Sequence, residues 1–398
     1  MHSNIQSLYE IAKKPSRKVL GLMSGTSLDG LDIALCEITG AGTATKLRLI
    51  QFTTVPYDAS IKDKLLSVFS KVSISLEHLC LLHPWIALQN AAMINETLKK
   101  WGISSHDVDL IASHGQTIYH APKSLHPHDA FGSATLQIGD GDHLAVHTGI
   151  ITLSDFRQKH IAAGGEGAPL AVYGDYILCT DKIEHRVLLN IGGIANYTYL
   201  PANGKLDQVF STDTGPGNTI MDAYMRKHFN QSFDRDGLVA QQGSVDAYLL
   251  STLKAHAFFK RSLPKTTGPE LFNLDFLEQA LATTNNNTLS HFDIMATLNK
   301  FSADTIVDTI ELYVSKEEQF NIYMSGGGMH NPILINHIQD RLPLIKIESS
   351  QKIGMHPDAK EAILFALLAN EAVAGEPMFA GNHATKMPVT MGKISFPN

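Results

Sequence analysis

The sequence predicts an α/β fold with helices packed on the faces of its sheets. Strand-like and helix-like segments alternate along the chain, which is typical of α/β proteins. Glycine-rich turns directly follow several of the strands, and ligands bind at such positions in α/β sheets. The chain has 398 residues, which is enough for a large core and for two domains.

The first half of the chain contains a group of strands and a long helix. The turn Asp29-Gly30 separates two apolar runs, which is a strong hairpin signal. Residues 84–101, PWIALQNAAMINETLKKW, have helical periodicity and strong helix formers. Residues 121–134 contain proline, glycine and several histidines, and they predict a loop. We expect strands over 18–23, 31–38, 47–56 and 108–113, the last of which ends at HGQT.

The second half repeats the opening pattern of strand, glycine turn and strand, now around Gly192-Gly193. The segment 359–374, AKEAILFALLANEAVA, predicts a strong helix that stops at Gly375. We expect further strands over 187–190, 194–200 and 320–324, and further helices over 221–229, 245–258 and 332–339.

The composition argues against several classes of protein. The net charge is −7 and no basic block is present, so neither nucleic acid nor an anionic membrane is expected as the main partner. Cys36, Cys80 and Cys179 are widely spaced and odd in number, which predicts reduced thiols rather than disulfides or a zinc site. The chain has no signal-peptide core and no run of eighteen apolar residues. We therefore expect a soluble, cytoplasmic protein.

Four polar, glycine-rich turns suggest a nucleotide site. Glycine lets backbone N–H groups approach a ligand closely, and hydroxyls add further donors that suit phosphate. One such turn alone is better explained as a solvated loop, but four at strand or helix ends are harder to explain in that way. The standard phosphate loop and the dinucleotide-binding motif are both absent. The turns are SGTSLDG (24–30), NIGGIAN (190–196), STDTGPGN (211–218) and SGGG (325–328).

Two groups of charged residues are candidates for substrate contacts. Asp213 lies among glycines and small polar residues, where it could act as a base or could cap the following helix, and both readings remain open. Asp155, Arg157 and Glu166 lie in TLSDFRQKHIAAGGEGAPL, and arginine suits a carboxylate. Taken alone, this cluster is better explained as a surface ion pair beside a mobile loop.

The histidines do not predict a metal centre. His143 and His147 have the i, i+4 spacing of metal ligands, but the glutamate of H-E-x-x-H and a third ligand are missing. His114 in SHGQT could contact a ligand, and a structural role is at least as plausible.

Several motifs together resemble the anhydro-N-acetylmuramic acid kinase family. They occur in the family's order and span the chain from residue 18 to 394. They are GLMSGTSLDGLDIAL, SHGQTIYH, SDFR with AAGGEGAPL, NIGGIANYT, DTGPGN, FDRDG, KTTGPELFN and MSGGGMHNP.

The resemblance implies a two-domain, actin-like ATPase (ribonuclease H-like) fold with ATP and sugar in the interdomain cleft. The expected N-terminal domain covers 17–182, with 375–396 returning to it, and the C-terminal domain covers 183–374. Family members use ATP, Mg²⁺ and water to open the anhydro ring and phosphorylate O6, giving N-acetylmuramic acid 6-phosphate and ADP in peptidoglycan recycling. A homodimer is also expected from the family, with ATP and the sugar as the small-molecule partners.

The resemblance also assigns roles to individual residues. Asp213 matches the family's general base. The nucleotide would contact Ser24, Gly25, Thr26, Ser27, Leu28, Asp29, Gly30, Leu31, Gly192, Gly193, Gly215, Gly217, Asn218, Gly326, Gly327 and Gly328. The sugar would contact His114, Asp155, Arg157, Gly165, Glu166 and Glu361.

Two positions depart from the family pattern, and both affect the expected sugar contacts. Glu166 replaces a common glutamine in the loop after DFR, and His160 lies where the family often has an acidic residue. Two other functions remain open on the residues alone. One is an ordinary hexose or carboxylate kinase of the same superfamily, and the other is a regulatory ATPase or sugar sensor.

Overall fold

The computed structural model describes residues 2–25, 27–123, 126–283, 289–314, 319–378 and 387–398. The chain divides into two compact units. The first unit combines Met1–Leu178 with Asp358–Asn398, and the second unit is Cys179–Pro357. The second unit is therefore a continuous segment inserted into the first.

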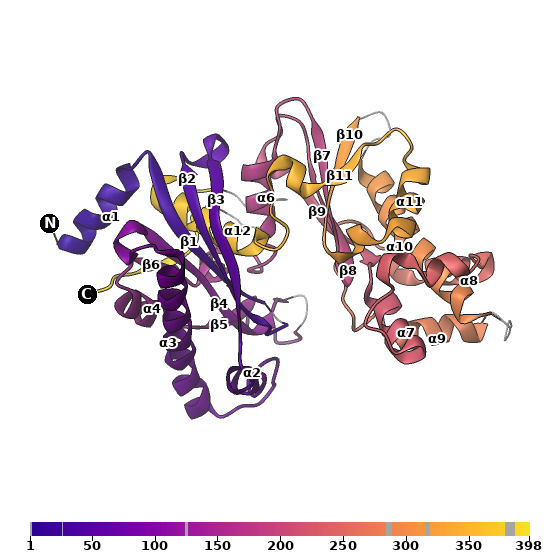
Figure 1. The fold of residues 1–398 in the computed structure, drawn as a ribbon, viewed down its shortest axis with the longest axis horizontal. Helices are drawn as coiled ribbons and strands as arrows, with labels where there is room; N and C mark the ends of the chain where they lie inside the picture. The colour runs from indigo at the N-terminus through magenta and orange to yellow at the C-terminus, as the bar shows by residue number, and fades with distance from the viewer. Residues whose placement is uncertain (1, 26, 124–125, 284–288, 315–318, 379–386) are drawn as a thin grey trace. The chain divides into compact units, whose positions relative to one another are not determined.

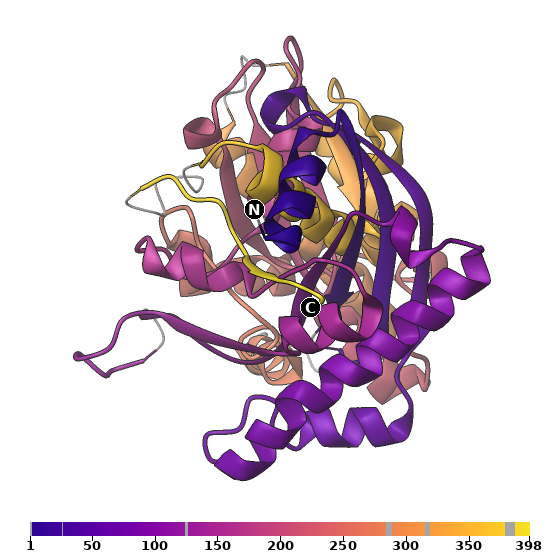
Figure 2. The same cartoon turned by 90° about the vertical axis from the view of Figure 1, so that its left-hand side faces the viewer.

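The first unit contains a mixed sheet with the strand order β12-β6-β4-β1-β2-β3, and β5 pairs with the outer part of β4. Strands β1, β2 and β3 form an antiparallel meander, whereas β4 and β6 add parallel to β1. Figure 2 shows the β4–β5 hairpin projecting from this unit. The strands are β1 (Ser16–Ser24), β2 (Gly30–Thr39), β3 (Lys46–Pro56), β4 (Leu110–Ala121), β5 (Ala134–Ile138), β6 (Thr152–Ser154) and β12 (Lys393–Ser395).

Helices cover both faces of this sheet (Figure 1). Leu20 and Leu22 of β1 share a buried cluster with Ile86 and Ile94 of α3. The opposite face of β1 packs on α12 so closely that a Cβ at Gly21 would lie 1.9 Å from the Ala362 carbonyl oxygen. The helices are α1 (Ser3–Lys13), α2 (Ala59–Leu66), α3 (Leu76–Trp101), α4 (Gly141–Thr148), α5 (Phe156–Ala162), α6 (Ala171–Cys179) and α12 (Lys360–Ala374).

The second unit repeats the strand arrangement of the first. Its sheet has the order β11-β10-β7-β8-β9, with an antiparallel meander β7-β8-β9 and with β10 and β11 parallel to β7. This duplication of three antiparallel strands followed by two parallel ones confirms the expected α/β, ribonuclease H-like fold class. The strands are β7 (His185–Ile191), β8 (Ile194–Leu200), β9 (Phe210–Pro216), β10 (Phe320–Ser325) and β11 (Ile347–Ser349).

A long buried helix organises the core of the second unit. Helix α10 begins with a capping box between Ser290 and Asp293, and its apolar side chains pack with those of the sheet in one cluster. The helices of this unit are α7 (Thr219–Phe229), α8 (Ala247–Lys254), α9 (Leu274–Thr283), α10 (His291–Tyr313) and α11 (Pro332–Arg341).

Most expected elements are present, and four details differ. The long helix begins at Leu76, where Ser75 caps it, rather than at residue 84. Strand β4 continues through HGQT to Ala121. The helix expected over 245–258 ends at Lys254, and a short 3-10 helix, Ala257–Lys260, follows. Finally, α12 belongs to the first unit rather than to the C-terminal domain, because it packs on β1, β2 and β4.

Candidate functional site

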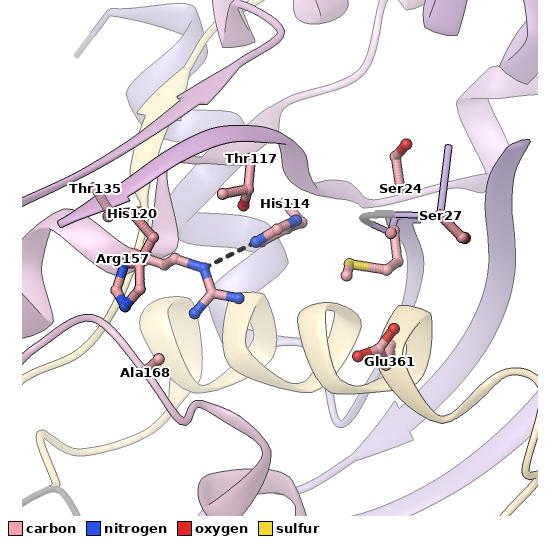
Figure 3. A pocket seen from close by; sticks show the side chains of 11 residues that line it. Ser24, Ser27, His114, Thr117, His120, Thr135, Arg157, Ala168 and Glu361 are labelled. Carbon is pink, nitrogen blue, oxygen red and sulfur yellow. Dashed lines mark hydrogen bonds between the residues drawn. The ribbon is translucent and has the colours of Figure 1, made fainter. Parts of the chain in front are cut away.

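The first unit holds a cavity of about 460 Å³ at the ends of β1 and β4, shown in Figure 3. Side chains from the three strands β1, β4 and β5, from α5 and from the first turn of α12 surround it. Three of the expected sugar ligands, His114, Arg157 and Glu361, lie together in its wall. The complete lining is Met23, Ser24, Gly25, Ser27, His114, Thr117, His120, Thr135, Arg157, Ala168 and Glu361.

The turn after β1 is fixed by a hydrogen bond to β4. The hydroxyl of Ser24 donates to Oε1 of Gln116 at 2.5 Å, and Nε2 of Gln116 donates to the carbonyl of Gly25 at 3.3 Å. A Cβ at Gly25 would meet only the Ser27 hydroxyl, at 3.7 Å. The backbone at Gly25 is therefore open to a ligand, as a phosphate turn requires. Thr26 lies outside the described residues.

The later residues of the same turn have structural roles. Leu28 has a left-handed φ of 56° and its side chain is buried in the core. A Cβ at Gly30 would lie 2.4 Å from the Val55 carbonyl oxygen, so this glycine permits the pairing of β2 with β3. Leu31 is also a core residue. Asp29 is exposed, and its carbonyl accepts a hydrogen bond from the Tyr57 amide.

Arg157 is held in the cavity wall by two acceptors. Its Nε donates to Nε2 of His114 at 2.9 Å, and its Nη1 donates to the carbonyl of Gly167 at 2.6 Å. His114 is buried against the ring of Phe365, with ring centroids 4.7 Å apart. Burial and the neighbouring Arg157 lower the pKa of His114 to about 3. The imidazole is therefore neutral and able to accept the hydrogen bond from Arg157.

Glu361 supplies a carboxylate to the same cavity from the first turn of α12. Its side chain is open to the cavity, yet the surrounding protein removes much of its hydration. This desolvation raises the pKa of Glu361, the charge of Asp32 raises it further, and Arg157 opposes the shift. The cavity thus contains a fixed cation and a partly desolvated carboxylate.

The other expected sugar ligands have different surroundings. The side chain of Asp155 forms an ion pair with Lys393 of β12 and does not line the cavity. A Cβ at Gly165 would lie 2.2 Å from the ring of His160, so the loop backbone packs directly on that histidine. Glu166 is exposed.

The sequence reasoning missed four residues of this site. Three of them line the cavity, namely Thr117, His120 and Thr135, and Gln116 supports the turn after β1. The strand was expected to end before HGQT, whereas it continues and its register with β5 shifts between Thr117 and Tyr119. This irregularity interrupts the usual alternation of faces, so the cavity positions Thr117 and His120 are separated by three residues rather than two. The motif SHGQTIYH was the only available signal for Gln116, Thr117 and His120, and Thr135 lies outside it.

The glycine turns of the second unit form one interlocked group. The amide of Gly217 donates to the carbonyl of Gly193 at 2.8 Å, and the amide of Asn218 donates to the carbonyl of Gly192 at 2.9 Å. A Cβ at Gly217 would lie only 2.3 Å from the Gly192 oxygen. The turn after β7 and the end of β9 therefore support each other.

Some glycines of this group pack against protein, whereas others face open space. Gly326, with φ of 83°, and Gly328 would each clash with Ile191 if they carried a Cβ. Gly215 has φ of 147° and faces Phe259. By contrast, a Cβ at Gly327 would meet nothing within 4 Å. Those at Gly192 and Gly193 would make only ordinary contacts, as such open backbone allows for a ligand.

Asp213 lies on β9 of the second unit, and its side chain does not cap α7. The cap residue of that helix is Asn218, whereas Oδ2 of Asp213 accepts a hydrogen bond from the Thr267 amide at 2.9 Å. Burial raises the pKa of Asp213 to about 6, the Thr267 amide opposes the shift, and Glu270 adds to it. A carboxylate with a pKa near neutrality is suited to general-base chemistry.

None of the described helices is both long enough and apolar enough to span a membrane. No three His, Cys, Asp or Glu side chains of the described part gather as metal ligands. Nδ1 of His143 instead forms a hydrogen bond with Oδ1 of Asp140 at 2.7 Å. Cys36, Cys80 and Cys179 form no disulfide.

Comparison with known proteins gives one consistent family. The family model described as anhydro-N-acetylmuramic acid kinase matches residues 17–396. The chain is 55% identical over 401 residues to the anhydro-N-acetylmuramic acid kinase of Pseudoalteromonas atlantica, with all of both chains covered. It is 38% identical to the enzyme of the same name from Caldanaerobacter subterraneus, covering 98% of this chain and 99% of the other.

Solved structures give a much more distant likeness. The activator of the 2-hydroxyisocaproyl-CoA dehydratase from Clostridium difficile, with bound ADPNP, matches at 12% identity with a TM-score of 0.40. The match covers 89% of this chain and 95% of that one. The sequence matches are far stronger, because the identity is 55% and 38% over nearly the whole length of both proteins. The chain therefore belongs to the anhydro-N-acetylmuramic acid kinase family.

Proposed function

We propose that this chain uses ATP and water to open 1,6-anhydro-N-acetylmuramic acid and to phosphorylate its O6, which gives N-acetylmuramic acid 6-phosphate and ADP. The observation that carries this proposal is the family match over residues 17–396, which includes all four glycine turns and Asp213. The pathway role would be the recycling of peptidoglycan sugars.

The chemistry of the substrate requires a base that acts on water. In the anhydro sugar, O6 is bonded to C1 and carries no proton. Asp213 would take one proton from a water molecule whose oxygen attacks C1. The C1–O6 bond breaks, and the electron pair left on O6 forms the bond to the γ-phosphorus of ATP. The bond from that phosphorus to ADP then breaks, and the second water proton remains on the new C1 hydroxyl.

The cavity of the first unit would bind the sugar. Arg157 keeps Nη2 without an acceptor among the described residues, and a guanidinium suits the carboxylate of the sugar's lactyl group. Glu361 would accept hydrogen bonds from sugar hydroxyls. The proposal requires that Asp213 of the second unit acts on the sugar bound in this cavity.

ATP would be bound through its phosphates by the open backbone at Gly25, Gly192, Gly193 and Gly327. Mg²⁺ would neutralise charge on those phosphates. The turn after β1 carries the Ser24 and Ser27 hydroxyls and the Asp29 carboxylate, oxygen donors of the kind that Mg²⁺ prefers. We further propose a cytoplasmic homodimer, which light scattering on the purified protein would test.

The deciding experiment is turnover with ATP–Mg²⁺ in ¹⁸O-labelled water. We expect activity with the anhydro sugar and none with N-acetylmuramic acid or glucose, and we expect label at C1 of the product. Label in the phosphate, or ATP hydrolysis that is independent of sugar, would overturn the mechanism and favour a regulatory ATPase. Turnover of an ordinary hexose would favour the simpler kinase.

The role of Asp213 is tested by Asp213→Asn, which preserves shape and removes basicity. We expect turnover to fall by about 10² to 10⁴, as is typical of a lost general base, with ATP and sugar still bound. The matched control is Asp246→Asn in the same unit. Asp246 caps α8 by accepting from the Leu249 amide, a role that asparagine also fills, so its activity should be unchanged. Near-normal turnover by Asp213→Asn would show that Asp213 is not the general base and has only a structural role.

A further inference from the structure

His160 is a buried polar side chain that does not line the cavity. It lies on α5 and is 1% exposed. Its Nδ1 accepts a hydrogen bond from the amide of Gly167 at 2.9 Å, which requires the ring proton to be on Nε2. Burial and the nearby Arg157 lower the pKa of His160, whereas Glu166 opposes the shift. The neutral ring, able to accept at Nδ1, is therefore the favoured form.

The ring of His160 is fixed from two sides. The loop backbone at Gly165 lies on one side, where a Cβ would come within 2.2 Å of the ring. Tyr173 of α6 packs edge-on, with centroids 6.4 Å apart. These contacts and the hydrogen bond from the Gly167 amide hold the ring in place, so its Nδ1 is an acceptor for the loop that follows α5.

Gly167 is bonded both to this histidine and to the cavity arginine. Its amide donates to His160, and its carbonyl accepts from Nη1 of Arg157 at 2.6 Å. Gly167 has φ of 81°, a conformation that glycine adopts without strain. The position of its carbonyl thus depends on the contact between its amide and His160.

Arg157 has only one other protein acceptor among the described residues, Nε2 of His114. Two acceptors define the plane of a guanidinium, whereas one leaves it free to rotate. Loss of the Gly167 contact would therefore release Arg157 without changing any side chain that touches the sugar. Orientation matters here because a carboxylate is recognised best in the guanidinium plane.

We propose that His160 is a positioning residue for the sugar: it holds Gly167, and Gly167 holds Arg157 in the orientation that binds the carboxylate of the substrate. This inference rests on the proposed function and adds to it a residue outside the cavity that sets substrate affinity. It also gives a role to one of the two positions at which the chain departs from the family pattern.

The first test compares His160→Asn with His160→Leu. The amide oxygen of asparagine can accept near the position of Nδ1, whereas leucine fills the space and accepts nothing. We expect His160→Leu to raise the KM for the anhydro sugar by about tenfold, the scale of one lost buried hydrogen bond. The KM for ATP should stay within about twofold, and His160→Asn should recover most of the sugar affinity.

The second test is a double-mutant cycle with Arg157→Ala. If His160 acts through Arg157, His160→Leu will not raise the sugar KM further once Arg157 is absent. A general structural defect would raise it by the same factor in both backgrounds. The matched control is His185→Leu in the second unit, where Nδ1 bonds the Tyr199 hydroxyl at 2.7 Å, and it should leave the sugar KM unchanged.

The outcomes separate this inference from the proposed function. If the wild-type protein does not turn over the anhydro sugar, the proposed function fails. If it does, an unchanged sugar KM in His160→Leu, or an equal increase in the Arg157→Ala background, overturns the positioning role. Should His160→Leu not fold, His160→Gln replaces it in the cycle, because its amide oxygen lies too far along the side chain to replace Nδ1.

Discussion

Asp213 shows how the surroundings of one residue can set its chemistry. Its carboxylate is partly buried on β9, accepts one amide hydrogen bond and lies within the field of Glu270. Desolvation dominates, so the pKa rises to about 6. A base of this kind is ionised at neutral pH and is basic enough to take a proton from water.

The pH dependence of activity follows from that pKa. A general base must be deprotonated, so kcat/KM should fall about tenfold per pH unit as the pH drops below about 6. Glu270→Gln removes a negative neighbour that raises the pKa of Asp213, so the acidic limb should move to lower pH. The protonation of ATP is the same in both assays. A difference between the pH profiles of the wild type and Glu270→Gln therefore comes from the enzyme. Coinciding limbs would contradict the assignment.

At the scale of elements, the turn after β1 combines an open backbone with a fixed frame. Ser24 and Gln116 tie the turn to β4, while Leu28 and Leu31 anchor its far end in the core. Gly25 is the part left open, and its φ is outside the left-handed region. A larger residue at Gly25 would therefore fit in the free protein and would clash only with a bound ligand.

We expect Gly25→Val to raise the KM for ATP at least about tenfold while the melting temperature stays within a few degrees. The β-branched side chain would occupy the space of the phosphates. The contrasting variant is Gly21→Val on the same strand, which must displace α12, since even a Cβ there lies 1.9 Å from the Ala362 oxygen. It should lose stability rather than nucleotide affinity alone. Unchanged ATP affinity in Gly25→Val would remove this turn from the nucleotide site.

Local sequence patterns were sufficient for about half of the helices and strands but not for their partners, and the buried helix α10 was not expected. The strands around the turns at 24–30, 190–196 and 325–328 were predictable because apolar runs stop sharply at polar turn residues. The element at 211–218 was expected to be a turn, whereas most of it belongs to strand β9. The strand was expected to end at HGQT, whereas Gln116 and His114 continue it and form hydrogen bonds to Ser24 and Arg157, which are distant in sequence. His114, Arg157 and Glu361 were expected from the family resemblance, whereas His120 was hidden by the irregularity of β4.

At the scale of the whole molecule, the two units repeat one strand order but differ in how the chain builds them. The second unit is the continuous segment Cys179–Pro357, and its core cluster draws on no residue outside that segment. The first unit needs two separate segments, because α12 covers one face of its sheet.

We therefore expect residues 179–357, expressed alone, to fold cooperatively. The fragment retains the whole of its sheet and the buried helix α10. Residues 1–178 alone should remain aggregation-prone, since the β1 face beneath α12 would be exposed. Thermal unfolding followed by circular dichroism checks both fragments. A fragment 179–357 without a cooperative transition would show that the second unit depends on the first.

The long stretch of sequence between the sheet of the first unit and α12 also has a consequence for synthesis on the ribosome. The ribosome makes β1 near the start of the chain, yet it must complete the entire second unit before α12 emerges to cover that strand. At 5–20 residues per second, the interval between the synthesis of β1 and that of α12 is roughly 20 to 70 s. The unit that begins first is thus completed last, and throughout that delay its nascent sheet is a target for chaperones that bind apolar strands.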